Sequence, residues 1–359
     1  MKKRSLGRTL LYWVVFILFF TLVPLLLLEG LGRAYIHFKH GKPGKTYGLW
    51  QYDKELGAIH SKNGYNTNAE TNDYGFRNVE AVIDPKPAGA LRLITYGGSI
   101  VFCYNLLNHE TWSAVLEGHL RKNHHPQDQV LNGGAIVWSL GHLFVRAKRD
   151  LPVLKPDYVI IYSGVNEHTN AMLAALEGKV MKDNVERGQY GTIATNLDQS
   201  RWSKRNLVLT RFMQYVIAPL LEKQAEATRE EIAREKTETA EAPSEPDPYI
   251  LENYLHVLDD FIELIKVNGG KPVFIIQAYG ANPSLNEYLT SYSRKGAELA
   301  KEKGAIVLDA REMVHSYEGD AADLFIPSGV HYTKLGAERF GAFIYQQLFE
   351  QPSTTSIVE

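Results

Sequence analysis

A serine stands directly after two glycines at a point where the sequence predicts that a buried strand gives way to a helix. Residues 91–95 (Leu-Arg-Leu-Ile-Thr) form an apolar run, Tyr-Gly-Gly-Ser follows at 96–99, and a helical pattern covers 111–120. A serine at such a junction presents its hydroxyl and its backbone N–H to the same point, and the glycines allow a tight turn with open space in front of it. The pattern indicates that Ser99 is a candidate nucleophile, although Gly-Gly-Ser is also ordinary loop chemistry.

Three further blocks of polar residues follow along the chain. Two of them come directly after strand-like apolar runs, and the third precedes a helical pattern near the C-terminus. They are Asn132-Gly133-Gly134, Ser163-Gly164-Val165-Asn166-Glu167 and Ser328-Gly329-Val330-His331-Tyr332-Thr333. Four blocks in this order resemble the SGNH (GDSL-like) hydrolase family, whose blocks contribute a serine, a glycine, an asparagine and a histidine. The resemblance runs from about Leu91 to Phe349.

The resemblance implies one chemical role for each block. Ser99 is the implied nucleophile, and His331 is the implied base that takes its proton, since histidine titrates near neutral pH. Attack on an ester carbonyl creates an oxyanion, for which the implied donors are the N–H groups of Ser99 and Gly134 and the side-chain amide of Asn166. Viewed alone, Gly134 also fits a turn and Asn166 a helix cap.

One position departs from the family pattern. The family carries an aspartate three residues before the histidine, where it orients the imidazole, but Ser328 occupies this position here. Three alternatives follow. The site works as a Ser99–His331 dyad, or Asp323 reaches in from the preceding segment as the acid, or the site has lost its activity.

No metal or other cofactor is expected. The chain has twelve histidines, and those at His109, His119, His124, His125 and His142 show no paired spacing of the usual ligand kind. Glu167, His168 and Ser328 are instead candidates for contacts with substrate. The single cysteine, Cys103, cannot form an internal disulfide and is interpreted as a packing residue. A formal net charge of -2 without a basic stripe predicts no nucleic-acid partner.

An apolar run from Leu10 to Leu28 predicts one membrane-spanning helix. Its length is close to the roughly 20 residues that cross a bilayer, which favours an uncleaved anchor over a signal peptide with a shorter apolar core. Basic residues precede the run, at Lys2, Lys3, Arg4 and Arg8. They favour a cytoplasmic N-terminus, so the expected location is the inner membrane with the catalytic domain on the periplasmic side.

Five predicted strands alternate with helical patterns, which favours an α/β fold with a parallel sheet flanked by helices. The resemblance implies the flavodoxin-like arrangement of SGNH hydrolases. The strands are expected at 92–96, 129–132, 158–162, 272–277 and 305–309. The carboxyl ends of such strands are where ligands gather, and Ser99, Gly134 and Asn166 all fall there.

The expected organisation is a tail over 1–9, a transmembrane helix over 10–28 and a juxtamembrane and preamble segment over 29–90. The hydrolase-like domain over 91–350 follows, with an insertion over 171–248 and a final tail over 351–359. The preamble contains a turn-like Asn-Asp-Tyr-Gly-Phe-Arg at 72–77, which is expected to pack beside the site. The insertion has an apolar set at helical spacing between Trp202 and Val216 that fits a lid, an acyl-binding wall or an ordinary core helix.

Two functions of different classes remain open. The favoured one is a serine esterase or deacylase, or an acyltransferase using the same acyl-enzyme, that acts on ester-linked acyl groups of an extracytoplasmic glycan or lipid. The alternative is a catalytically silent protein of the same fold that binds carbohydrate or serves assembly at the membrane. Water or a sugar hydroxyl would resolve the acyl-enzyme, and the sequence does not distinguish them.

Overall fold

The computed structural model describes residues 6–40, 44–66, 68–167, 246, 248–280 and 283–350. His168, the expected tail over 351–359 and the expected insertion, apart from Pro246 and Pro248, lie outside the described residues. The described residues belong to two units, which divide between Tyr47 and Gly48. Residues 48–90 of the expected preamble therefore belong to the same unit as the sheet.

The N-terminal unit is an apolar helix. It consists of α1 (Leu6–Ile17), a π-helical turn η1 (Leu18–Leu22) and α2 (Val23–His40), followed by the short strand β1 (Thr46–Tyr47). The stretch Thr9–Gly32, 24 residues, is long and apolar enough to cross a membrane. At 1.5 Å per residue it extends about 36 Å, which exceeds the roughly 30 Å of a bilayer's hydrocarbon core.

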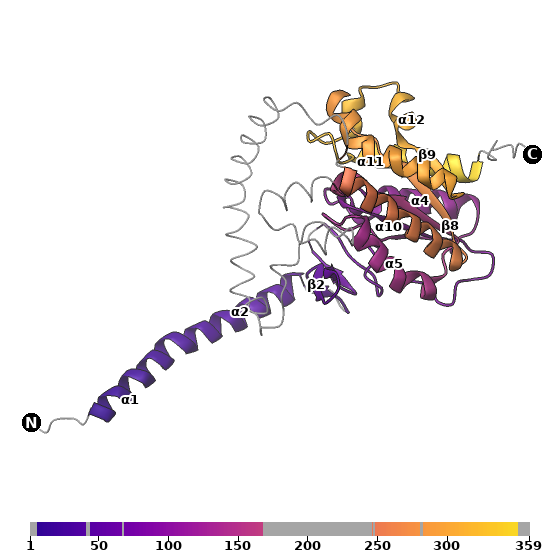
Figure 1. The fold of residues 1–359 in the computed structure, drawn as a ribbon. Helices are drawn as coiled ribbons and strands as arrows, with labels where there is room; N and C mark the ends of the chain where they lie inside the picture. Colours follow the sequence, from indigo (N-terminus) through magenta and orange to yellow (C-terminus); the bar gives the residue numbers. More distant parts are fainter. Residues whose placement is uncertain are drawn as a thin grey trace, which may run out of the picture. The chain divides into compact units, whose positions relative to one another are not determined.

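The second unit is built on a five-stranded parallel sheet, which confirms the α/β fold class (Figure 1). Its strands are β5 (Arg92–Gly97), β6 (Gln129–Asn132), β7 (Tyr158–Tyr162), β8 (Lys271–Ile276) and β9 (Ile306–Asp309). All five predicted strands are confirmed within one residue. The spatial order β6-β5-β7-β8-β9 is the flavodoxin-like order, in which the direction of strand addition reverses between β5 and β7.

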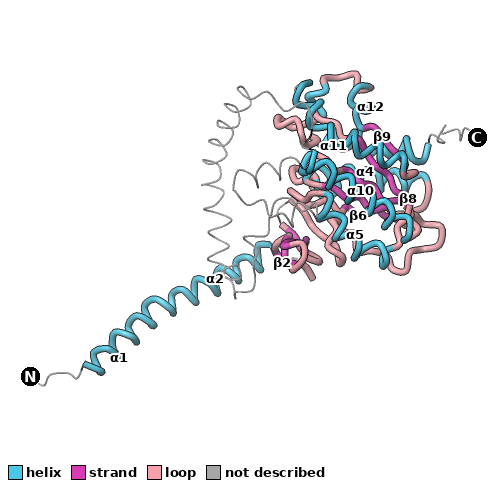
Figure 2. Tube along the Cα trace, in the orientation of Figure 1, coloured by secondary structure: helices cyan, strands magenta, loops and turns pink. Residues whose placement is uncertain are grey.

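Each face of the sheet carries its own apolar core, because successive side chains of a strand point to opposite faces. Ile94 and Tyr96 face one core, whereas Leu93 faces the other. The first core is covered by helices α5 (Leu140–Leu154), α10 (Pro248–Val267) and α11 (Pro283–Glu302). The second is covered by α4 (Trp112–Asn123), α12 (Ala310–His315) and α13 (Lys334–Tyr345). The strands are therefore buried on both faces, and Figure 2 shows them enclosed by helices.

Short elements complete this unit. The antiparallel hairpin β2–β3 precedes the sheet, and short helical turns flank several of the loops. These elements are β2 (Trp50–Asp53), β3 (Gly57–His60), β4 (Gly64–Tyr65), α3 (Ser99–Phe102), η2 (Asn108–Glu110), η5 (Ala321–Leu324) and η6 (Gln346–Glu350).

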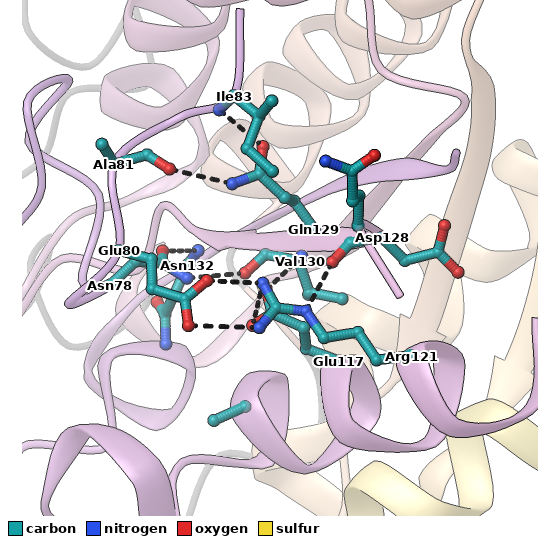
Figure 3. A network of polar contacts seen from close by, with 12 residues as sticks. Asn78, Glu80, Ala81, Ile83, Glu117, Arg121, Asp128, Gln129, Val130 and Asn132 are labelled. Atoms are coloured by element: carbon teal, nitrogen blue, oxygen red, sulfur yellow. Dashed lines mark hydrogen bonds and ion pairs between the residues drawn. The ribbon is translucent and has the colours of Figure 1, made fainter. Parts of the chain in front are cut away.

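Residues 78–83 cover the edge strand β6 by side-chain hydrogen bonds (Figure 3). Asn78 Nδ2 donates to Val130 O at 2.9 Å, and Asn78 Oδ1 accepts from Asn132 N at 2.9 Å. Each of these backbone groups would otherwise stand open at the edge of the sheet. The amide of Asn78 therefore replaces part of a missing strand.

An ion-pair cluster on α4 closes the same edge (Figure 3). Arg121 binds both carboxylate oxygens of Glu80, at 2.7 and 3.2 Å, and Glu117 Oε2 accepts from Val130 N at 2.8 Å. Burial raises the pKa of Glu117 to about 7. The segment after residue 77 is thus tied to both the edge strand and the helix beside it.

Candidate active site

Ser99 is the first residue of the four-residue helix α3, directly after the carboxyl end of β5. The first N–H groups of a helix have no partner inside it, so the Ser99 N–H points out beside the Ser99 hydroxyl. The two preceding glycines are required by close packing. A Cβ at Gly97 would lie 2.5 Å from Tyr162 O, and one at Gly98 would lie 2.2 Å from Asn166 Nδ2.

His331 meets Ser99 across 232 residues of sequence. Its Nε2 lies 2.8 Å from Ser99 Oγ. The turn that carries His331 is fixed by a hydrogen bond from Ile326 N to His331 O at 2.8 Å, and α13 begins just beyond it with Thr333 as its cap. The histidine is therefore held on both sides by backbone structure.

Burial lowers the pKa of His331 to about 4 because the charged imidazolium loses its hydration. The ring is therefore neutral at pH 7, and a neutral Nε2 can accept the proton of the Ser99 hydroxyl. The other ring nitrogen, Nδ1, is buried and has no hydrogen-bond partner within the described part of the chain. The ring of Tyr104 packs edge-on against the imidazole, with centroids 4.7 Å apart.

Neither residue considered as the orienting partner of His331 bonds to Nδ1 in this arrangement. Ser328 is exposed, and its Oγ accepts only a long 3.5 Å contact from Val330 N. Asp323 is exposed as well, and it is its backbone carbonyl that accepts from Thr333 Oγ1 at 2.7 Å. The main chain of Asp323 thus bonds to the residues after His331, while its side chain is exposed.

Asn166 follows β7 and lies against Gly98. Its Nδ2 donates one hydrogen bond, to Trp138 O at 2.8 Å. A side-chain amide has two N–H donors, so a second donor remains, and Asn166 lines the same small cavity as Ser99. Asn166 and Ser99 come from β7 and β5, the two strands between which the order of the sheet reverses.

The structure differs from expectation at Gly134. Its N–H donates to Asn132 Oδ1 at 3.0 Å and is therefore not open to an oxyanion. The glycine serves close packing instead, because a Cβ there would lie 2.3 Å from Phe102 N in α3. The side chain of Asn132, two residues earlier, is short enough to accept this hydrogen bond within the loop.

Glu167, an expected substrate contact, is almost completely buried. It is 1% exposed, and its Oε1 accepts from Leu140 N, the first residue of α5, at 2.5 Å. Burial raises the pKa of Glu167 to about 7. Its Oε2 is buried without a partner among the described residues. The carboxyl group therefore bonds to the start of α5, while Glu167 also lines the cavity beside Ser99.

A small cavity opens beside Ser99 at the carboxyl ends of β5 and β7. Polar groups line it together with the apolar edges of Ile100, Trp138 and Val165. The lining residues are Gly98, Ser99, Ile100, Trp138, Tyr162, Ser163, Gly164, Val165, Asn166, Glu167 and Gln277. Among the described residues, no group of three or more His, Cys, Asp or Glu side chains is placed to hold a metal ion.

Two features of the site carried no sequence signal. Val137 adopts φ +67, a left-handed conformation that is uncommon for a β-branched residue and costs about 1–3 kcal/mol. It directly precedes Trp138, whose carbonyl holds Asn166. Tyr104 was also missed, because its contact with His331 depends on the turn after α3. Left-handed geometry at valine is visible only in the folded backbone.

Comparison with known proteins found similar structures but no match by sequence. No protein-family model matches the chain, and no curated protein matches it. One similar structure is a Desulfitobacterium hafniense DCB-2 protein attributed to the lipolytic G-D-S-L family, with 15% identity, a TM-score of 0.43 and coverage of 72% of this chain and 99% of that chain. Another is the acetylxylan esterase Axe2 from Geobacillus stearothermophilus, with 16% identity, a TM-score of 0.44 and coverage of 72% and 94%. A third is LAE5, an alpha/beta hydrolase from the Lake Arreo metagenome, with 13% identity, a TM-score of 0.44 and coverage of 72% and 95%.

The burial of His331 has a measurable consequence. With its pKa near 4, the imidazole should stay neutral from pH 8 to pH 5, whereas a solvated histidine titrates near 6.5. The measurement is an NMR titration of protein carrying ¹³C-labelled histidine, in which the His331 signal is the one that is absent from His331→Ala. A midpoint near 6.5 for that signal would show that the ring is solvated and not enclosed as described.

Proposed function

We propose that the chain is a membrane-anchored serine esterase of the SGNH type, in which Ser99 and His331 act as a dyad. The observation that carries this proposal is the 2.8 Å contact between Ser99 Oγ and His331 Nε2 at the start of a helix. The order of the four sequence blocks supports it independently. In this reading the Ser99 N–H and the second N–H of Asn166 form the oxyanion hole.

The reaction would proceed in two steps. Ser99 Oγ bonds to the carbonyl carbon of the ester while its proton passes to His331 Nε2, and the developing oxyanion meets the two donors. The carbon–oxygen bond of the ester then breaks, and the leaving alkoxide takes the proton from His331. Water, or a sugar hydroxyl in the case of acyl transfer, would release the acyl group from Ser99 by the same proton movements in reverse.

The dyad would be a slow catalyst. A base with a pKa near 4 accepts a proton reluctantly at neutral pH, and the imidazolium formed in the first step would carry a buried Nδ1–H without an acceptor. The same observation favours the second candidate, a membrane-tethered protein that binds carbohydrate or serves assembly without turnover. Esterase activity is the proposal because the serine and the histidine keep bonding distance.

The proposed substrate is an acylated glycan or lipid on the outer side of the inner membrane. The apolar helix is long enough to serve as a single-pass anchor, and the basic residues ahead of it support a cytoplasmic N-terminus. Residues 48–350 would then lie on the periplasmic side. An anchored enzyme meets substrates that are themselves confined to the membrane or the adjacent glycan.

Replacement of Ser99 tests the nucleophile directly. The full chain in detergent should be labelled at Ser99 by a fluorophosphonate probe, and Ser99→Ala should lose both labelling and turnover of short-chain esters, because no other hydroxyl contacts His331 Nε2 among the described residues. Ser316→Ala is the matched control, since within the described ranges Ser316 Oγ bonds only to Met313 O on α12. Labelling that persists in Ser99→Ala would refute the assignment.

Replacement of Ser328 tests the missing acid. An aspartate at this position can rotate toward Nδ1 and stabilise the imidazolium, so Ser328→Asp should raise the pKa of His331 and increase kcat by about tenfold or more. Asp323→Asn is the comparison, and it should change kcat by less than about twofold because this side chain is exposed. The readouts are the histidine titration and ester turnover. A large loss of kcat in Asp323→Asn would instead identify Asp323 as the acid that supports His331.

Inactivity of the wild type and of both variants, with the fold intact, would favour the second candidate function, a protein that binds carbohydrate without turnover.

The topology proposal has its own test. A reporter enzyme that matures only outside the cytoplasm, fused after residue 359, should be active, since the one candidate span among the described residues, with an inner N-terminus, places the C-terminus outside. The control is the same fusion lacking residues 1–40. Activity of a reporter that works only in the cytoplasm would show the inverse orientation.

A further inference from the structure

Residues 72–77, ahead of the sheet, fold into a closed turn. Asn72 Oδ1 accepts from Tyr74 N and Phe76 N, both at 3.0 Å. Gly75 takes φ +82, and a Cβ there would lie 2.9 Å from His60 O, so the position requires glycine. The turn sends Phe76 and Arg77 into the interior, where they are 0% and 2% exposed.

The guanidinium of Arg77 binds the end of the helix that begins at Ser99. Its Nη1 donates to the carbonyls of Phe102 and Cys103, and its Nη2 donates to the carbonyl of Leu106. The guanidinium carbon also lies 4.5 Å from the centre of the Phe102 ring. A four-residue helix cannot stabilise itself, and its last carbonyls lack partners within it. Arg77 supplies those partners and places a cation at the end of the helix that favours one.

The segment that Arg77 holds also reaches the histidine. Tyr104 packs edge-on against the His331 ring, and Asn105 Nδ2 donates to Tyr332 O at 3.0 Å. Residues 99–106 therefore run from the nucleophile, over Arg77, to the turn of the base. No other residue described contacts both the end of α3 and the turn that follows it through one charged group.

Arg77 itself is anchored firmly. Its backbone N–H donates to Asn132 O at 2.8 Å, at the end of β6. The next residue, Asn78, bonds to the same edge strand through its side chain (Figure 3). The backbone of Arg77 is thus fixed to β6, and its guanidinium holds the segment that follows Ser99 at a defined position relative to the sheet.

We propose that Arg77 is a positioning residue that sets the distance between Ser99 and His331 by holding the carbonyls of residues 102–106. It touches neither the substrate nor the reacting atoms. The link to catalysis rests on the proposed function, whereas the effect on the geometry of His331 does not. The fork of the guanidinium suits this role because its two nitrogens reach the carbonyls of Phe102 and Cys103 and that of Leu106 at the same time, whereas lysine offers one nitrogen as a point charge.

Arg92 provides a matched control. It is also 2% exposed and also bonds to backbone carbonyls, those of Leu154 and Ile83. Its Nε is buried without a partner among the described residues, as is that of Arg77. It lies at the opposite end of β5 from Ser99. Loss of either fork should lower stability, but only Arg77 is placed to change the site.

The experiment compares Arg77→Lys with Arg92→Lys in the full chain in detergent, at a temperature where circular dichroism shows both to be folded. Arg77→Lys should slow fluorophosphonate labelling about tenfold or more and lower kcat with little change in KM, because misplacement of reacting groups costs rate. The midpoint of the His331 titration should rise by about one pH unit or more toward the 6.5 of a solvated imidazole. Arg92→Lys should lose similar thermal stability and leave both readouts at their wild-type values.

Each outcome decides the proposal. Unchanged labelling and titration in Arg77→Lys, or equal changes in Arg92→Lys, would overturn it. If the wild type is not labelled, the esterase proposal fails, but the titration of His331 still tests the positioning by Arg77. If Arg77→Lys does not fold, Asn72→Ala loosens the turn while keeping the guanidinium, and the same two readouts apply. An unchanged titration in a folded Asn72→Ala would also overturn the proposal.

Discussion

The site depends on how closely the carboxyl ends of β5 and β7 approach each other. The parallel pairing of these strands brings Gly97 beside Tyr162, and the absence of a side chain at Gly98 lets the Asn166 amide lie against the backbone just before Ser99. A Cβ at Gly98 would lie 2.2 Å from Asn166 Nδ2, too close for both atoms to stay where they are. The position of Ser99 therefore depends on close packing of the backbone at Gly97, and the position of the Asn166 amide depends on the space left at Gly98 and on its hydrogen bond to Trp138 O.

The same constraint explains why much of the fold and part of the site could be predicted. Strands that are buried on both faces consist of apolar runs. The sequence therefore located β5, β6 and β7 and the polar residues that follow them. The parallel arrangement then brings Ser99 and Asn166 to one edge. The proximity of His331 came from the resemblance, because no local pattern relates residues that lie 232 positions apart.

The roles of Gly134, Glu167 and Arg77 could not be predicted, because they depend on which donors and acceptors lie close together in the folded chain. Gly134 N–H could serve an oxyanion or a neighbouring side chain, and Asn132 Oδ1 lies close enough to capture it. Glu167 sits next to Asn166 in sequence but points to the start of α5, whose backbone donors attract a carboxylate. The role of Arg77 was also invisible, since a lone arginine in a polar segment usually faces solvent.

Charge is distributed unevenly around the nucleophile. Burial keeps His331 neutral and raises the pKa of Glu167 to about 7, so neither group contributes a full fixed charge at neutral pH. Burial lowers the pKa of Arg77 to about 10, so its guanidinium stays charged at neutral pH, and it pairs with carbonyls, with no carboxylate bound to it among the described residues. The guanidinium is thus a buried charge that persists at neutral pH, and the carbonyl oxygens of Phe102, Cys103 and Leu106 solvate it in place of water.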